Sequence, residues 1–384
     1  MRIAILSTSV TSGGAAVVTT SLANALMKIG HEVKLFTIEG NRKLKPSFWA
    51  ERLGIFARNG FRRDSLFKVS MADFGECRIV DKVRNFSPDV IILGWINQGF
   101  LSLNQIAEIS KIAKTYWVMH DMWNFTGICH HSYGCQHFTY KCGNCPMVAD
   151  FLKGKNDLSS VGWKRKARLY NDTQLKFIAV SSWVKQHALR SSLLENADIT
   201  VVPNVYPLDE FYIGKKEQGL IVWGAECLDN HIKGLSFAVD ALNRLPKYLN
   251  AKVIFFGGYK DISALNELKI PYELTGTLST NDVKDLLSRA QVVLSTALYE
   301  TFGNTLLEGQ ASGAVPVSFN RGGQVDIIDH MKSGFLADFG DVEAIARGLE
   351  WSLTDAPSPE KLRQYACEKF GEESVAKRYE TLLQ

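Results

Sequence analysis

Long apolar runs are missing from this sequence of 384 residues. No stretch approaches the roughly 18 uncharged apolar residues that a membrane-spanning helix needs. The opening segment turns polar after Leu6, too early for a secretory signal peptide. Cysteine is also scarce and odd in number, at seven residues, and a chain this long does not need disulfides to fold. We therefore expect a cytoplasmic protein whose thiols are reduced.

A dinucleotide fingerprint is missing too. The segment TSVTSGGAA after the first predicted strand places Gly13 and Gly14 ahead of a helix, but it is not GxGxxG. The absent spacing argues against a dinucleotide oxidoreductase. Two glycines at a helix start still let backbone amides approach phosphate or sugar oxygens. A simple structural turn would use the same glycines.

What is present is a large apolar fraction and an uneven charge. With 46% apolar and 22% charged residues, the length favours two globular domains. Residues 1–200 carry 26 Lys and Arg against 15 Asp and Glu, whereas residues 201–384 carry 18 against 25. The basic half indicates contact with something anionic, such as a membrane surface, a phosphorylated acceptor or nucleic acid. Two differently solvated surfaces would give the same pattern.

Short β-branched and aromatic runs alternate with amphipathic stretches along the whole chain, which is typical of an α/β fold with parallel sheets. The predicted strands are residues 2–9, 31–38, 89–95, 115–121 and 176–182, then 219–225, 251–258, 291–297 and 314–319. The chain therefore divides into two Rossmann-like halves. Prolines and an asparagine follow a strand near Pro203 to Pro207, and we place the linker there. The predicted domains are 1–202 and 203–365, with a C-terminal helix, 366–384, able to pack on the first.

Two glutamates mark the second half. Glu300 lies at the carboxyl end of a predicted strand, and Glu308 lies inside the next predicted helix. Open α/β sheets bind ligands at that end. The turn through Gly303, Asn304 and Thr305 would present backbone N–H groups to an anionic phosphate at a helix N-terminus. One carboxylate could then hold a ribose and the other a sugar ring, because carboxylates accept hydrogen bonds from hydroxyls. A helix and its turn could also carry two such glutamates by chance.

This segment, Glu, seven residues, then Glu, resembles the signature of the retaining glycosyltransferases of family four, including members that build polysaccharides and O-antigens. The similarity extends through VVPN, Gly322-Gly323 and SGFLAD. The resemblance implies the GT-B architecture of two facing Rossmann-like domains with a cleft between them. It also implies that Glu308 binds the nucleotide ribose, that Glu300 binds the donor sugar, and that the loop of Gly13 and Gly14 faces the donor.

Lys233 begins an amphipathic stretch and can neutralise a pyrophosphate as a point charge. Many family members also carry an arginine just after the preceding strand, where this chain has Ala225-Glu226. His120 ends a predicted strand beside Asp121, which could bias its tautomer. By the resemblance, His120 contacts the transferred sugar or the transition state, and Glu300 acts with it as a catalytic residue. A lone histidine at a strand end can also be purely structural.

Four of the seven cysteines fall in one loop. Cys129, Cys135, Cys142 and Cys145 are separated by five, six and two residues. Four thiolates that close with a Cys-x-x-Cys pair match the ligand count of a structural zinc site, although the first spacing is wide. His130, His131 and His137 are spare ligands. Reduced buried thiols, an iron–sulfur cluster and disulfides are the alternatives. We expect one structural zinc and no cofactor for catalysis.

The segment from Asn41 to Lys68 holds eight Lys or Arg against two acids, interleaved with Phe48, Trp49, Phe56, Phe61 and Phe67. A second basic aromatic cluster runs from Trp163 to Arg168. Such stretches suit an anionic membrane surface, where a lipid-linked acceptor would be found, and they also suit nucleic acid. Loops and helices that merely cover the core would look the same.

We therefore predict a glycosyltransferase of the hexosyltransferase class that moves a sugar from a UDP- or GDP-sugar to a hydroxyl. The predicted acceptor is a glycan or lipid-linked molecule of surface polysaccharide biosynthesis, at the inner face of the membrane. A nucleotide-sugar epimerase would use the same donor contacts but would form product without an acceptor. A nucleic-acid-binding protein built on the cysteine loop would have no use for the glutamates. Nucleic acid is therefore not an expected partner.

Overall fold

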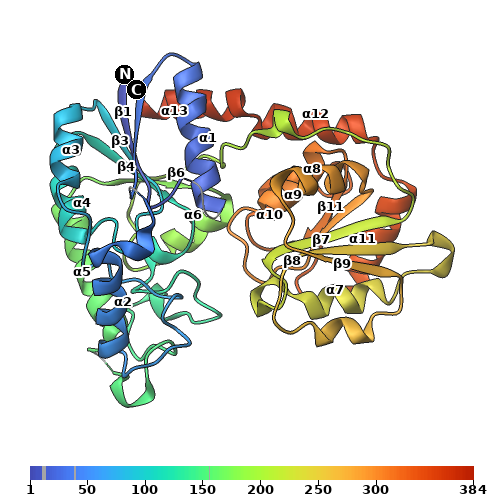
Figure 1. Ribbon diagram of the computed structural model, residues 1–384, viewed down its shortest axis with the longest axis horizontal. Helices are drawn as coiled ribbons and strands as arrows, with labels where there is room; N and C mark the ends of the chain where they lie inside the picture. The colour runs from blue at the N-terminus through green and yellow to red at the C-terminus, as the bar shows by residue number, and fades with distance from the viewer. Residues whose placement is uncertain (11–13, 39, 155) are drawn as a thin grey trace. The chain divides into compact units, whose positions relative to one another are not determined.

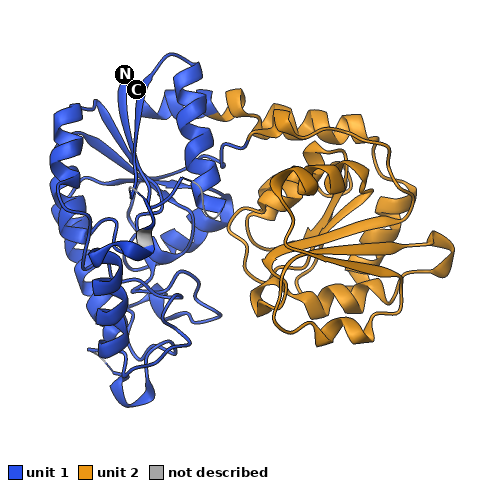
Figure 2. Cartoon of the chain, viewed as in Figure 1, with its two compact units in different colours: residues 1–206, 376–384 blue, residues 207–375 orange. Residues whose placement is uncertain are grey.

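The computed structural model describes residues 1–10, 14–38, 40–154 and 156–384. Each half of the chain folds around a parallel sheet of six strands, and helices cover these sheets (Figure 1). Clustering of contacts gives two compact units: residues 1–206 with 376–384, and residues 207–375 (Figure 2). Among the described helices, none combines the length and apolar character needed to cross a membrane.

Unit 1 has the strand order β2-β1-β3-β4-β5-β6. Most residues of its interior strands are apolar and buried, as expected for a parallel sheet covered on both faces. Its elements are β1 (Arg2–Leu6), α1 (Gly14–Lys28), β2 (Glu32–Phe36), α2 (Pro46–Arg58), α3 (Ile79–Phe86), β3 (Val90–Leu93), α4 (Leu103–Ile109), β4 (Lys114–Met119), α5 (Leu158–Asp172), β5 (Lys176–Ala179), α6 (Ser182–Leu189) and β6 (Ile199–Val201).

Unit 2 has the strand order β12-β11-β10-β7-β8-β9 around a second apolar core. Its elements are β7 (Leu220–Cys227), α7 (Leu235–Leu242), β8 (Lys252–Gly258), β9 (Tyr272–Gly276), α8 (Thr280–Arg289), β10 (Val292–Ser295), α9 (Asn304–Ala311), β11 (Val315–Phe319), α10 (Gln324–Ile327), β12 (Phe335–Ala337), α11 (Val342–Thr354) and α12 (Pro359–Phe370). All nine predicted strands are present, so the predicted α/β class with two Rossmann-like sheets is confirmed.

The last helix, α13 (Glu372–Leu383), begins in unit 2 and ends in unit 1. Its residues Ala376, Tyr379 and Leu383 are buried. The hydroxyl of Tyr116 on β4 donates a hydrogen bond to the carbonyl of Leu382 at 2.7 Å. The first division between the units falls between residues 206 and 207, at the end of the segment in which the linker was expected. The C-terminal helical pattern forms two helices, α12 and α13.

Helix starts place several functional loops. Asp157 caps α5 by accepting the backbone N–H of Ser160 at 3.0 Å, and its other oxygen accepts the backbone N–H of Cys145 at 2.8 Å. One carboxylate thereby fixes both a helix and the end of the cysteine loop. In unit 2, α9 follows Gly303, whose φ of +108° is a left-handed conformation that glycine adopts without strain.

Candidate functional site

The topology of unit 2 marks one place where a ligand can bind. Strand β7 lies between β8 and β10, so the chain runs outward from β7 on one side and from β10 on the other. Ligands of open α/β sheets bind beyond the carboxyl ends of the strands at such a switch point. The loops after β7 and β10 therefore form the candidate site, and they carry Lys233 and Glu300.

Lys233 and Glu300 are paired in this structure. The ammonium Nζ lies 3.0 Å from Oε2 of the carboxylate, and the two side chains are 29% and 22% exposed. The other carboxylate oxygen, Oε1, accepts the backbone N–H of Thr301 at 3.1 Å. The charge of Glu300 raises the pKa of Lys233 although burial opposes it, so the lysine is charged at neutral pH. The pair is only partly enclosed, and solvent or a ligand can reach it.

A tight backbone contact positions Lys233. Gly234 has a φ of +68°, and a Cβ at this position would lie 2.1 Å from the carbonyl oxygen of Thr296. The hydroxyl of Thr296 in turn donates to the carbonyl of Gly234 at 2.8 Å. Asn230 caps the short helix that ends at Lys233. Only glycine fits here, and so the loop after β7 is held against the end of β10.

The first turns of α9 carry the remaining predicted residues of unit 2. Asn304, Thr305 and Glu308 are half-buried, and Asn304 and Glu308 share a helix face because they are four residues apart. Glu300 belongs to the loop before this helix. The structure thus brings Lys233 and Glu300 into contact and sets Glu308 on the adjacent helix.

Sequence reasoning missed one cation at this edge. Arg321 follows β11, and its guanidinium lies 4.0 Å from the ring centre of Phe339 and 5.4 Å from that of Tyr299. The next glycines pack on the Glu300 loop, where the N–H of Gly323 donates to the carbonyl of Glu300 at 2.8 Å. Glu226, where an arginine is common in the resembling family, adds to the negative field at Lys233. The sequence signal that could have identified Arg321 is its position directly before a glycine pair.

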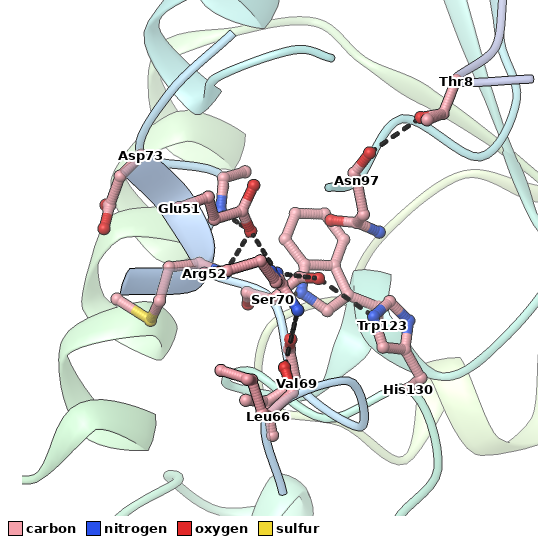
Figure 3. A network of polar contacts seen from close by, with 12 residues as sticks. Thr8, Glu51, Arg52, Leu66, Val69, Ser70, Asp73, Asn97, Trp123 and His130 are labelled. Atoms are coloured by element: carbon pink, nitrogen blue, oxygen red, sulfur yellow. Dashed lines mark hydrogen bonds and ion pairs between the residues drawn. The ribbon is translucent and has the colours of Figure 1, made fainter. Parts of the chain in front are cut away.

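Unit 1 has its own switch point, between β1 and β3. Thr8, after β1, donates its N–H to the carbonyl of Trp95 and its hydroxyl to the carbonyl of Asn97, each at 2.8 Å (Figure 3). Gly14 is the first residue of α1 and is exposed, while Gly13 lies outside the described residues. His120 follows β4 at the same edge of the sheet, because all strands are parallel.

His120 and Asp121 have different surroundings. Burial lowers the pKa of His120 to about 4, against a smaller effect of Asp121, so its imidazole is neutral at pH 7. Asp121 accepts hydrogen bonds from the indole of Trp95 at 2.9 Å and the backbone N–H of Trp123 at 2.8 Å. Its Oδ2 also lies 2.7 Å from Nδ1 of His130. Asp121 therefore fixes the imidazole of His130, and its charge also acts on His120, beside which the sequence placed it.

The charge of Asp121 is strongly stabilised. Burial alone would raise the pKa of Asp121, but the charge and hydrogen bond of His130 and the N–H of Trp123 outweigh it. The pKa of this carboxyl is held well below its usual range. The carboxyl of Asp121 is thus ionised throughout the physiological pH range.

A chain of polar contacts continues from His130 into the core (Figure 3). Its Nε2 lies 3.1 Å from the hydroxyl of Ser70, and Arg52 reaches that hydroxyl at 3.4 Å. Arg52 also pairs with Glu51 at 3.0 Å, and both are fully buried. The order Asp, His, Ser matches a hydrolytic triad, but Ser70 is 0% exposed. No substrate can reach Ser70, and this series of polar contacts is therefore structural.

The four loop cysteines lie around one cavity of about 20 Å³, which His137 also lines. Burial raises the pKa of Cys129 far above its usual value and that of Cys142 to about 12. Lys166 on α5 is buried beside them, and burial lowers its pKa to about 7. Within the described residues, no three His, Cys, Asp or Glu side chains are already arranged to hold a metal ion.

Comparison with known families decides the identity of the chain. Residues 12–210 match the profile of Glycosyltransferase Family 4, and residues 210–369 match that of Glycosyl transferases group 1. The chain belongs to glycosyltransferase family 4. The predicted family is thereby confirmed, and with it the enzyme class of the family, a glycosyltransferase.

Curated relatives resemble this family 4 chain over part of their length. The 2-deoxystreptamine N-acetyl-D-glucosaminyltransferase of Niallia circulans is 28% identical over 60% of this chain and 61% of its own length. The N-acetyl-alpha-D-glucosaminyl L-malate synthase of Bacillus anthracis is 24% identical over 39% of this chain and 42% of its own. The chain thus spans less than two thirds of these relatives.

Solved structures share the fold over the whole chain. The sucrose-phosphate synthase of Thermosynechococcus elongatus has a TM-score of 0.67 and 15% identity, covering 100% of this chain and 98% of its own. HepE of Anabaena, solved in complex with UDP-glucose, has a TM-score of 0.65 and 15% identity, covering 100% and 99%. These neighbours have the GT-B fold, which confirms the predicted fold class of this family 4 member.

Proposed function

We propose that the protein is a retaining glycosyltransferase that moves a sugar from a UDP- or GDP-sugar to a hydroxyl of a glycan or lipid-linked acceptor in surface polysaccharide biosynthesis. The observation that carries the proposal is the Lys233–Glu300 pair at the switch point of unit 2. A charged lysine beside a carboxylate suits a ligand that has both phosphate and hydroxyl groups. Relatives that transfer N-acetylglucosamine or mannose, by their names, support the donor class.

Each residue receives one role in the proposed complex. Lys233 faces the diphosphate, and Glu308 accepts hydrogen bonds from the ribose hydroxyls. Glu300, Asn304 and Thr305 bind the sugar and the adjoining phosphate. Arg321 is a candidate for the positive charge that the family arginine supplies elsewhere, because its loop packs on that of Glu300.

The proposed reaction breaks the bond between the anomeric carbon and the diphosphate oxygen, which keeps the bonding electrons. Lys233 stabilises the charge that develops on that oxygen. The acceptor hydroxyl attacks from the face the diphosphate leaves, and its proton passes to the departing phosphate. His120, neutral at pH 7, contacts the sugar without placing a positive charge beside the positive anomeric carbon. No catalytic metal takes part in this scheme.

The ribose assignment is tested by Glu308→Gln. The variant keeps the shape of the side chain but loses the charge that strengthens hydrogen bonds to hydroxyls. We expect nucleotide affinity to fall about tenfold in a titration with UDP, GDP, ADP and CMP, of which UDP is the first candidate. Glu343→Gln, a change of the same kind at an exposed position of α11, should bind as the wild type does. Equal affinities for Glu308→Gln and wild type would refute the ribose assignment.

An epimerase on the same fold would use the same donor contacts. Incubation of the nucleotide-sugar without an acceptor separates the two activities, because an epimerase then forms a new nucleotide-sugar while the proposed transferase does not. Nuclear magnetic resonance of the anomeric signal follows both reactions. The configuration of the transferred sugar, read in the same spectra, tests retention.

We also propose that unit 1 contacts an anionic membrane at the inner face, where a lipid-linked acceptor lies. Trp49, Phe61 and Phe67 are 50%, 69% and 60% exposed among the basic residues of segment 41–68, whereas Phe48 is buried in the core. Flotation with anionic vesicles should show binding that salt weakens. Phe61→Ser with Phe67→Ser should reduce it, and Tyr248→Ser, 67% exposed in unit 2, should not. Wild-type protein that never floats would contradict the membrane contact.

A further inference from the structure

We propose that Cys129, Cys135, Cys142 and Cys145 bind one structural Zn²⁺ ion as a tetrathiolate, at a site separate from the transfer chemistry. The four residues come from the single loop that connects β4 to α5 in unit 1. The proposal rests on the cavity that they line, the backbone turn that joins two of them, and a buried cation beside them.

The cavity has the size of an ion. Its volume is about 20 Å³, which is enough for a single ion. All four cysteines line it, and Ile128, Phe138 and Met147 belong to the remaining wall. Zinc bound to four sulfurs is tetrahedral, with bonds of about 2.3 Å, and tolerates such apolar surroundings because a structural site needs no open position.

The backbone joins the last two cysteines in a tight turn. Asn144 between them is left-handed, with a φ of +51°, and its N–H donates to the carbonyl of Gly154 at 3.1 Å. The N–H of Cys145 donates to Asp157 at 2.8 Å. The turn is thus anchored at two points, and both of its cysteines line the cavity. A preformed Cys-x-x-Cys turn removes much of the ordering cost that metal binding would otherwise carry.

Two nitrogen groups lie close to the sulfurs, the backbone N–H of Gly127 and the side chain of Lys166. The backbone N–H of Gly127 donates to Sγ of Cys142 at 3.1 Å, the kind of contact that supports a metal-bound thiolate. Lys166 is 1% exposed, and its Nζ donates to the carbonyls of Trp123 and Thr126. A zinc ion with four thiolates has a net charge of −2, which a cation at this position would offset.

Binding requires a small rearrangement. The described side chains are not yet set as three or more metal ligands, so the thiols must turn about their Cα–Cβ bonds toward the cavity. Each cysteine side chain has only this one torsion to adjust. The four thiols release four protons to solvent when Zn²⁺ enters, which leaves the complex with two negative charges.

The ion would support the polar contacts around His130 and Asp121. Cys129 directly precedes His130, whose carbonyl accepts the N–H of Met122 at 3.0 Å and whose ring pairs with Asp121. A metal-fixed loop therefore holds the residues that follow His120. Loss of zinc should loosen unit 1 and leave unit 2 intact.

The test begins with metal analysis of the full chain purified without added zinc. We expect about one zinc per chain, and well under half an equivalent would overturn the proposal. Cys135→Ser and Cys142→Ser should lower the zinc content below half, because each removes a ligand. A matched variant with Cys77, Cys227 and Cys367 all changed to Ser should keep the full equivalent, since these cysteines lie outside the loop.

A second measurement covers the case in which the loop variants fail to fold. Native wild-type protein is treated with a thiol reagent while a coloured chelator reports released zinc. We expect the four loop thiols to react only as zinc appears, in the ratio of four thiols to one ion. Loop thiols that react without zinc release, iron in place of zinc, or a native mass lighter by four hydrogens would each refute the site.

Discussion

The two units of this molecule use their charged groups in opposite ways. In unit 2, Lys233 and Glu300 form an ion pair that is 29% and 22% exposed and open to a ligand. In unit 1, Arg52 and Glu51 are buried as a pair, and Asp121, only 14% exposed, pairs with His130. The comparison teaches that unit 2 offers charge to a ligand, whereas unit 1 uses its charge to hold its loops.

The overall charge of the halves would have predicted the reverse. The first 200 residues are strongly basic and the rest are acidic. Yet the cation that the proposed phosphate contact needs, Lys233, lies in the acidic half, and the ring that we place near the sugar, His120, is neutral at pH 7. Local pairing decides what a site can bind, and net charge governs only longer-range attraction.

The largest expected effect tests the open pair. Lys233→Met removes the charge that stabilises the leaving diphosphate, and kcat/KM should fall by about 10² to 10³. Folding should change little, because the pair is partly exposed. Lys252→Met breaks the 2.7 Å ion pair between Lys252, at the start of β8, and Glu217. This variant should keep kcat/KM within a factor of about two. Equal losses in the two variants would remove the distinction between this pair and an ordinary surface pair.

The next effect tests the enclosed cluster. Asp121→Asn leaves the charge and the hydrogen bonds of His130 and Trp95 poorly matched, and it should lower the free energy of unfolding by about 3 kcal/mol. Urea denaturation measures this loss, and nucleotide affinity in unit 2 should stay unchanged. Asp198→Asn removes an exposed pair with Lys176 and should cost less than about 1 kcal/mol. A loss of nucleotide binding with unchanged stability would mean that Asp121 serves a ligand.

The smallest effect concerns the pH dependence of His120. Its pKa is about 4 in the folded chain and about 6.5 when unfolded, so only the unfolded chain takes up this proton between those values. Its contribution to stability is complete above pH 6.5 and declines as pH falls toward 4. Wild type should lose about 2 kcal/mol more than His120→Gln between pH 6.5 and 5.

Denaturation at several pH values checks this difference. The wild-type and His231→Gln proteins should behave alike, because that imidazole is exposed. Asp121 does not interfere in this range, since its pKa is depressed and its contribution is lost only at lower pH. Parallel pH curves for wild type and His120→Gln would show that the imidazole is solvated.

The fold was predictable where apolar runs were long. All predicted strands appear, and several contain continuous apolar runs such as Val90–Leu93 that favour buried parallel strands. The edge strands β9 and β12 escaped prediction, since Tyr272–Gly276 is largely exposed and Phe335–Ala337 has only three residues. Edge strands bury less side-chain surface, and so their sequences show weaker patterns.

The site was predictable as a set of positions rather than as a set of contacts. Glu300 and Lys233 could be chosen from their places beside strands, but their pairing depends on the left-handed turn at Gly234 against Thr296. Likewise, nothing local shows that Asp121 pairs with His130, nine residues further along the chain. Such contacts arise from tertiary packing of loops and have no sequence period.

The path of α13 affects how the protein is made. Unit 2 is one continuous stretch of chain, residues 207–375, but unit 1 includes residues 376–384. The surface of unit 1 that residues 376–384 cover, which includes Tyr116 of β4, is therefore exposed while the ribosome synthesises unit 2. Unit 1 emerges first and is completed last, so this surface is open to chaperones while residues 207–375 are made.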